Sequence, residues 1–151
     1  MAAAGGATSA PAGRPSQPPP ALGALSDAGA RSAAVLLADA SEARRQGDLR
    51  ATLALLQAAV ERAPTIETHA ALGTLYLELG AARRAESNLR AAAEGDPGNA
   101  DRWVALANAL ALKPDPFAAA AALERAQGAE PGVRIARDAG GRLARQPAPV
   151  P

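Results

Sequence analysis

The sequence predicts an all-α array of three helical hairpins that stack side by side. Prolines at positions 64, 97 and 131 lie 33 and 34 residues apart, and each has an Ala five residues before it and a Leu eight residues before it. Between these prolines the apolar residues recur at helical spacing, and no segment shows a convincing strand pattern. A period of this length is typical of small units that cannot bury their apolar faces alone. We therefore expect stacking to create a surface for binding, in preference to a catalytic pocket.

Composition sets limits on the class of protein. The chain has 151 residues, 48% of them hydrophobic but only 2% aromatic, and most of the apolar share is Ala, which favours close contact between helix backbones. There is no Cys, so disulfides and thiolate zinc sites are excluded, and we expect neither metal nor cofactor. The formal charge of +1 argues against a nucleic-acid partner.

The first 25 residues differ from the rest of the chain. They are rich in Ala, Pro and Gly and contain neither a secretory signal pattern nor an apolar run long enough to span a membrane. We expect residues 1–25 to form a disordered arm. Gly, Pro or charges also interrupt every later apolar stretch, so no membrane insertion and a cytoplasmic location are the simplest expectations.

Capping and breaking residues divide residues 26–131 into six helices. Short polar side chains begin a helix because they accept hydrogen bonds from its first free amides, and the expected caps are Ser26 or Asp27, Asp48, Thr65, Asn99 and Asp115. Pro116 supports the last start, since proline suits the first helical position. Helices end at glycine or before proline, and the expected stops are Gly47, Pro64, Gly80, Pro97 and Pro131.

The tail, residues 132–151, is basic, with four Arg against one Asp. We expect a weak capping helix there, whose residues Val133, Ala136 and Leu143 cover the last hairpin. Disorder is expected after this helix. The pair Gly140-Gly141 costs such a helix about 2 kcal/mol relative to two alanines. An incomplete cap would leave apolar surface on the sixth helix, so a homo-oligomer is a further hypothesis.

On these residues the chain resembles the tetratricopeptide-repeat family. That pattern requires Leu-Gly, an aromatic residue three positions on, then Gly, Ala, a large apolar residue, Ala and Pro. The middle unit supplies all eight, as Leu72, Gly73, Tyr76, Gly80, Ala85, Leu89, Ala92 and Pro97. The third unit supplies Trp103, Leu106, Ala107, Leu110, Ala119, Leu123, Ala126 and Pro131, with Ala in place of Gly and Leu in place of the aromatic residue. The first unit is looser, with Asp39, Ala40, Ala43 and Thr52 in place of the expected residue types.

The resemblance implies a right-handed superhelical α-solenoid with repeats at about 33–65, 66–99 and 100–131. In this family the first helix of each hairpin lines a concave groove. The inward positions implied by the resemblance are Leu37, Ser41, Arg44 and Arg45 in the first unit, Ala70, Thr74, Leu77 and Glu78 in the second, and Val104, Asn108 and Leu112 in the third. Three of these, Ser41, Thr74 and Asn108, occupy the same slot, and such a row of donors and acceptors suits the backbone of an extended peptide. The alternative is that they are polar residues tolerated on an unoccupied face.

Catalysis has little support in the sequence. His69 is the only His, with no Cys, second His or Ser and Asp arrangement to make it a base. We therefore expect a non-catalytic adaptor or scaffold that binds a peptide or helix of a partner protein in its groove. Two alternatives remain: a chaperone or assembly factor for subunits of a secretion, pilus or envelope complex, and a regulatory subunit of an enzyme such as a glycosyltransferase.

Overall fold

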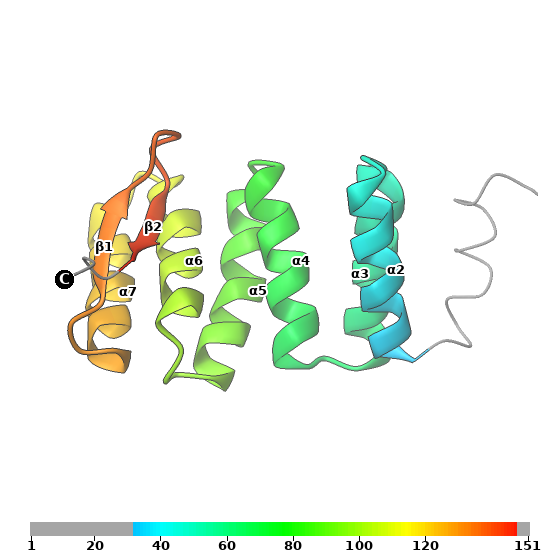
Figure 1. Ribbon diagram of the computed structural model, residues 1–151, viewed down its shortest axis with the longest axis horizontal. Coiled ribbons are helices and arrows are strands. Elements are labelled where there is room, and N and C mark those ends of the chain that lie inside the picture. Colours follow the sequence, from blue (N-terminus) through cyan, green and yellow to red (C-terminus); the bar gives the residue numbers. More distant parts are fainter. Residues whose placement is uncertain (1–31, 148–151) are drawn as a thin grey trace, which may run out of the picture.

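The computed structural model describes residues 32–147, which fold into six helices followed by two strands. The helices are α2 (Ala33–Arg45), α3 (Leu49–Arg62), α4 (Ile66–Glu78), α5 (Ala82–Gly95), α6 (Ala100–Ala111) and α7 (Pro116–Ala129), and the strands are β1 (Arg134–Arg137) and β2 (Leu143–Gln146). Consecutive helices form three hairpins that succeed one another along the long axis of the molecule (Figure 1). The predicted α-solenoid is confirmed. The expected N-terminal arm, residues 1–25, lies outside the described residues.

Local capping chemistry sets the helix boundaries. The predicted caps Asp48, Thr65 and Asp115 each accept a hydrogen bond from the backbone amide three residues later, at 2.9, 3.2 and 3.1 Å, and the predicted Asn99 accepts one from Asp101 at 3.1 Å. The prediction for the first helix was wrong, because α2 begins at Ala33 and Ser32 is its cap. Ser26 and Asp27 lie outside the described residues.

Glycines close the turns within the first two hairpins. Gly47 and Gly80 have φ of +78° and +70°, a conformation that side-chain-bearing residues rarely adopt. Each turn reverses the chain directly after the first helix of its hairpin, so the two helices of a unit pack against each other.

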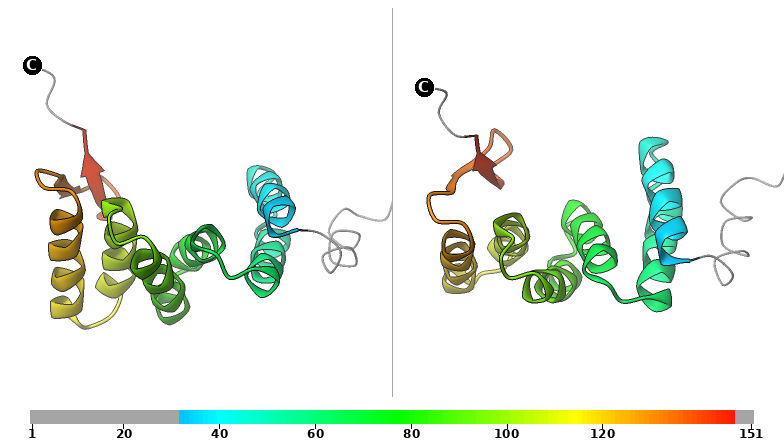
Figure 2. Two further views of the ribbon diagram at one scale, coloured as in Figure 1. Left: turned by 90° about the horizontal axis from the view of Figure 1, so that it is seen from below. Right: turned by 60° about the horizontal axis from the view of Figure 1, so that its bottom comes forward.

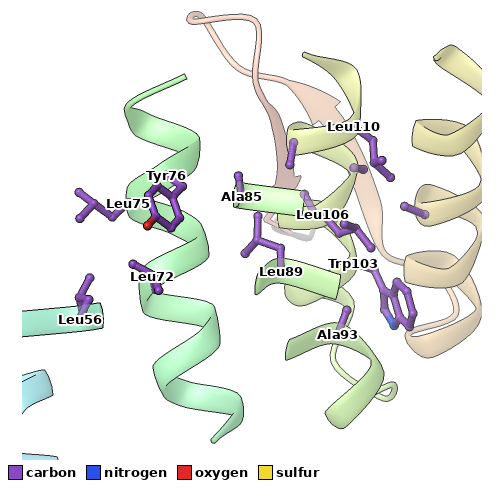
Figure 3. Close-up of a cluster of buried hydrophobic side chains, with 14 of the residues drawn as sticks. Leu56, Leu72, Leu75, Tyr76, Ala85, Leu89, Ala93, Trp103, Leu106 and Leu110 are labelled. Carbon is purple, nitrogen blue, oxygen red and sulfur yellow. The ribbon is translucent and has the colours of Figure 1, made fainter. Parts of the chain in front are cut away.

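Large apolar side chains fill the spaces between adjacent hairpins (Figure 3). Leu72, Leu75 and Tyr76 of α4 are buried, as is Leu89 of α5, which faces the predicted small position Gly73. A Cβ added at Gly73 would lie 2.7 Å from the Leu89 Cγ, so glycine is what allows α4 and α5 to approach this closely. Trp103 is buried too and belongs to the core, as predicted.

Thr68 is a structural residue that the sequence analysis did not single out. Its side chain is 0% exposed, and its Oγ1 accepts from the Thr65 amide at 2.9 Å and contacts the Ala63 carbonyl oxygen at 2.9 Å. Together with the Thr65 cap it forms a reciprocal capping box at the start of α4. This box fixes the connection between the first and second hairpins.

The tail corrects the prediction of a capping helix, because residues 134–146 form an antiparallel β-hairpin. β1 pairs with β2 in the register Arg134 with Gln146 through Arg137 with Leu143. The Asp138 carboxylate accepts from the amides of Gly140 and Arg142, both at 2.9 Å, and Gly141 has φ of +76°. A side chain that binds its own turn, followed by a residue in the left-handed region, stops a helix and favours a hairpin loop.

The β-hairpin also does not cover the outer side of the last helix, where a capping helix was expected. It lies across the face of the array to which α6 contributes, with β2 against α6 (Figures 1 and 2). The far side of α7 is left exposed, and Phe117 there is 85% exposed. Among residues 32–147, no helix has both the length and the apolarity that crossing a membrane requires.

Candidate functional site

The first helices of the hairpins, α2, α4 and α6, carry all the predicted groove residues except Leu112, which caps α6. We call the surface they form the groove face. Its members are Leu37, Ser41, Arg44 and Arg45 on α2, Ala70, Thr74, Leu77 and Glu78 on α4, Val104 and Asn108 on α6, and Leu112 at the C-terminal cap of α6. An ion pair between Arg44 and Glu78 links the groove residues of α2 to those of α4.

A small hollow lies on this face between the first two hairpins. Its volume is about 90 Å³, and α2 and α4 line it with Leu37, Ala40, Ser41, Arg44 and Ala71, with Thr52 and Leu56 of α3 at the base. Leu37 and Leu77 are half-buried, so part of each side chain stays accessible. The hollow has the size of one aliphatic side chain and a polar rim formed by Ser41 and Arg44.

Two members of the predicted polar row use their hydroxyl protons within their own helices. The Ser41 Oγ donates to the Leu37 carbonyl at 2.9 Å, and the Thr74 Oγ1 donates to the Ala70 carbonyl at 2.8 Å. A hydroxyl oxygen that donates its proton keeps its lone pairs. Ser41 and Thr74 are therefore set to accept hydrogen bonds, such as those from the amides of an extended chain.

Asn108, the third member of the row, binds the backbone of this chain itself. Its Nδ2 donates to the Leu143 carbonyl at 2.8 Å, and its Oδ1 accepts from the Leu143 amide at 2.7 Å. Both polar groups of one residue in β2 are thus satisfied by a single amide side chain. This is the two-bond pattern that one strand offers to a neighbouring strand.

The β-hairpin closes the third-unit end of the groove face. Val104, expected to contact a guest, is buried, with 6% of its surface exposed. Leu112 at the C-cap of α6 is exposed. The groove face is therefore open at the first and second units and filled at the third.

The charged groove residues have partners within the array. Arg44 pairs with Glu78, and Arg45 pairs with Glu42 of its own helix. A ligand carboxylate near the first unit would have to compete with Glu78 for Arg44. These pairs make the open half of the groove face nearly neutral.

A further ion pair lies between units two and three. Glu86 of α5 contacts the Lys113 Nζ at 2.7 Å and the Arg90 guanidinium at 2.8 Å. The hydrogen bond from Lys113 lowers the pKa of the Glu86 carboxyl below its ordinary value of 4.5. This contact ties α5 to the loop between α6 and α7.

The remaining chemically versatile side chains serve the fold. His69 is half-buried, and its Nδ1 lies 3.0 Å from the Asn88 Oδ1 across the α4–α5 contact. The Trp103 Nε1 donates to the Pro97 carbonyl at 3.0 Å, and the Arg125 guanidinium lies over its ring. Within residues 32–147, no three His, Cys, Asp or Glu side chains come together in a way that would hold a metal ion.

No protein-family model matches the sequence, and no match to a curated protein was found. Among solved structures, the chain is similar to YrrB, described as a TPR protein with an unusual peptide-binding site, at 23% identity and a TM-score of 0.62. That alignment covers 68% of this chain and 53% of YrrB. The chain is also similar to a variant of the O-GlcNAc transferase of Thermobaculum terrenum, at 26% identity and a TM-score of 0.57, over 77% of this chain and 21% of the transferase. The chain thus spans about half the length of YrrB and a fifth of the transferase.

Proposed function

Starting from the premise that the chain is a protein of the tetratricopeptide-repeat type, we propose that it is a non-catalytic binding module whose groove face holds an extended segment of a partner protein. The observation that carries this proposal is the pair of hydrogen bonds between Asn108 and the Leu143 backbone. One slot of the polar row already binds an extended backbone, and the equivalent slots in the other units, Ser41 and Thr74, remain open to a second one.

The open half of the groove face suits a neutral, partly apolar segment. Its hollow of about 90 Å³ accepts one aliphatic side chain beside Leu37, and Leu77 offers a second apolar contact. The hydroxyl oxygens of Ser41 and Thr74 accept from the segment's amides, since their own protons are used within α2 and α4. YrrB, the similar protein noted above, is described as having a peptide-binding site, which favours the same class of ligand.

The experiment is affinity capture from the native source, followed by titration of each captured partner. Leu77→Asp places a charge in the open half of the groove face, and Leu49→Asp, on the exposed start of a second helix, is the matched control. We expect Leu77→Asp to weaken binding at least about tenfold, or about 1.4 kcal/mol, and the control to leave it unchanged. Equal affinities for wild type and Leu77→Asp, with both folded by circular dichroism, would remove the groove face from the proposal.

A second candidate is an accessory subunit of an enzyme. The likeness to part of an O-GlcNAc transferase favours it, because it places an array of similar fold within a glycosyltransferase. Measuring the rate of a captured enzyme with and without this chain tests this candidate, and an unchanged rate at saturation would reject it.

Co-expression distinguishes an assembly chaperone, which raises the solubility of its partner and then dissociates, from an adaptor, which stays bound.

A further inference from the structure

We infer that the third-unit end of the groove face is a sequence-selective site for an extended segment with an apolar residue followed two positions later by a basic one, and that β2 is its resident ligand in cis. The inference deepens the proposed function, on which it rests, by naming the ligand pattern. Three contacts define the site. Asn108 bonds to the ligand backbone at Leu143, a pocket lies beside the Leu143 side chain, and carboxylates of the array pair with Arg145.

The backbone contact explains why the ligand must be extended. Antiparallel strands alternate between residues whose polar groups face the paired strand and residues whose polar groups face away. The Arg142 carbonyl bonds to Asp138 across the β-hairpin, so the amide and carbonyl of the next residue, Leu143, face outward toward Asn108. A helical residue uses both groups within its own helix and cannot offer them to one side chain together.

The apolar contact selects the side chain at the first position. Leu143 lines a pocket of about 300 Å³, and the other apolar residues around it are Ala111, Pro116, Ala119, Ala120 and Leu123. The small alanines leave room for a branched aliphatic side chain, and Leu143 is half-buried there. Lys113 and Arg137 also line the pocket, so a basic residue at this position would meet like charges and no carboxylate of the lining.

The basic contact selects the side chain two positions later. Arg145 projects from the same face of β2 as Leu143, because side chains two apart in a strand point the same way. Its guanidinium pairs with Glu130 at the end of α7 and lies 3.9 Å from an Asp101 oxygen at the start of α6. Because Leu143 meets the late residue Asn108 and Arg145 meets the early residue Asp101, the ligand runs antiparallel to α6.

The remaining hairpin arginines do not share this arrangement. Arg137 donates to the Gly141 carbonyl within the turn, and Arg134 and Arg142 are exposed with no side-chain partner among residues 32–147. Arg145 is thus the hairpin arginine that has carboxylates of the array as partners. General attraction between a basic tail and an acidic array would not single out one arginine in this way.

The test uses the full-length chain and a synthetic peptide with the sequence of residues 132–147. The double substitution Leu143→Lys and Arg145→Glu frees the site from its resident strand while leaving the array residues in place, because a lysine at 143 would meet Lys113 and Arg137 and a glutamate at 145 would meet Glu130 and Asp101. We expect this chain to bind the peptide at least about tenfold more tightly than wild type does, because a segment in cis competes at an effective concentration of about millimolar. Adding Asn108→Ala to the same chain should return the affinity to the wild-type value or below.

A peptide carrying the same two substitutions is the matched ligand control and should not bind. Hydrogen exchange on the otherwise native chain provides a second measurement: Arg145→Glu should raise exchange at the Leu143 amide, and Arg142→Glu should not. The inference is overturned if the freed chain fails to bind the peptide, if Asn108→Ala leaves that binding intact, or if the two arginine variants exchange alike. These measurements need no natural partner, so their failure is distinct from the failure of the capture experiment with Leu77→Asp.

Discussion

Replacing Gly73 by alanine should destabilise the array, although alanine is the better helix former. A Cβ at this position would lie 2.7 Å from the Leu89 Cγ, 2.9 Å from its Cδ2 and 3.1 Å from the Asn88 Cβ. Contacts below 3.0 Å force atoms to move, and the Leu89 Cγ is the branch point of a side chain that is 2% exposed. The substitution must therefore push α4 and α5 apart or drive Leu89 out of its rotamer.

The magnitude follows from two opposing terms. Overpacking of a well-packed core costs about 1–3 kcal/mol, and two contacts below 3.0 Å place Gly73→Ala in the upper half of that range. Alanine gains about 1 kcal/mol of helix propensity over glycine. The net loss in the free energy of unfolding is therefore about 1–2 kcal/mol.

Urea unfolding followed by circular dichroism at 222 nm measures this loss. With a denaturant slope of about 1–3 kcal/mol per molar, the midpoint should fall by about 0.3–2 M. Gly128→Ala is the matched control, since a Cβ at Gly128 in α7 meets nothing within 4 Å, and that variant should gain about 0.5–1 kcal/mol. A Gly73→Ala variant as stable as wild type would refute the close-approach argument, and a smaller cost in a Leu89→Ala background would identify the clashing partner.

Two further substitutions test the contacts between hairpins. Thr68→Val preserves shape but removes the hydroxyl bonded to Thr65 and Ala63, so urea unfolding should show a loss of about 1–3 kcal/mol. Glu86→Gln should cost about 0.5–1 kcal/mol at pH 7. Because Lys113 lowers the pKa of Glu86 in the folded chain, its contribution is present above pH 4.5 and is lost as the pH falls through the folded pKa. The wild type should therefore lose more stability than Glu86→Gln below pH 4.5, and parallel pH profiles would contradict this.

The six helices could be predicted because their boundaries depend on local chemistry. Asp48, Thr65 and Asp115 act within one turn of their own helices, and Gly47 supplies a backbone conformation that its neighbours cannot adopt. The first boundary was misplaced because Ser26, Asp27 and Ser32 are all competent caps, and sequence alone does not rank them.

The tail could not be predicted in the same way. Gly140-Gly141 signalled weak helix propensity, but a strand needs a partner, and β2 is held by β1 and by Asn108, 35 residues before Leu143. The groove positions were implied by the resemblance to the tetratricopeptide-repeat family, and the repeat period places Asn108 in line with Ser41 and Thr74. What the period does not reveal is that one of these equivalent slots is already occupied. The period also does not reveal the partners of Arg145, because Asp101 and Glu130 come together only where α6 begins and α7 ends in the folded chain.

The resident strand makes Asn108 and Arg145 respond differently to substitution. A ligand that needs a free site binds with an apparent dissociation constant equal to its intrinsic value divided by the fraction of free sites, so a strand bound 99% of the time weakens a guest about a hundredfold. Arg145→Glu raises the free fraction and leaves the array intact, so peptide 132–147 should bind this variant more tightly than wild type. Asn108→Ala raises the same fraction but removes the backbone contact that the peptide also needs. The two variants should therefore shift peptide affinity in different directions although both increase hydrogen exchange at Leu143, and a parallel gain in affinity would show that Asn108 holds the β-hairpin without belonging to the ligand site.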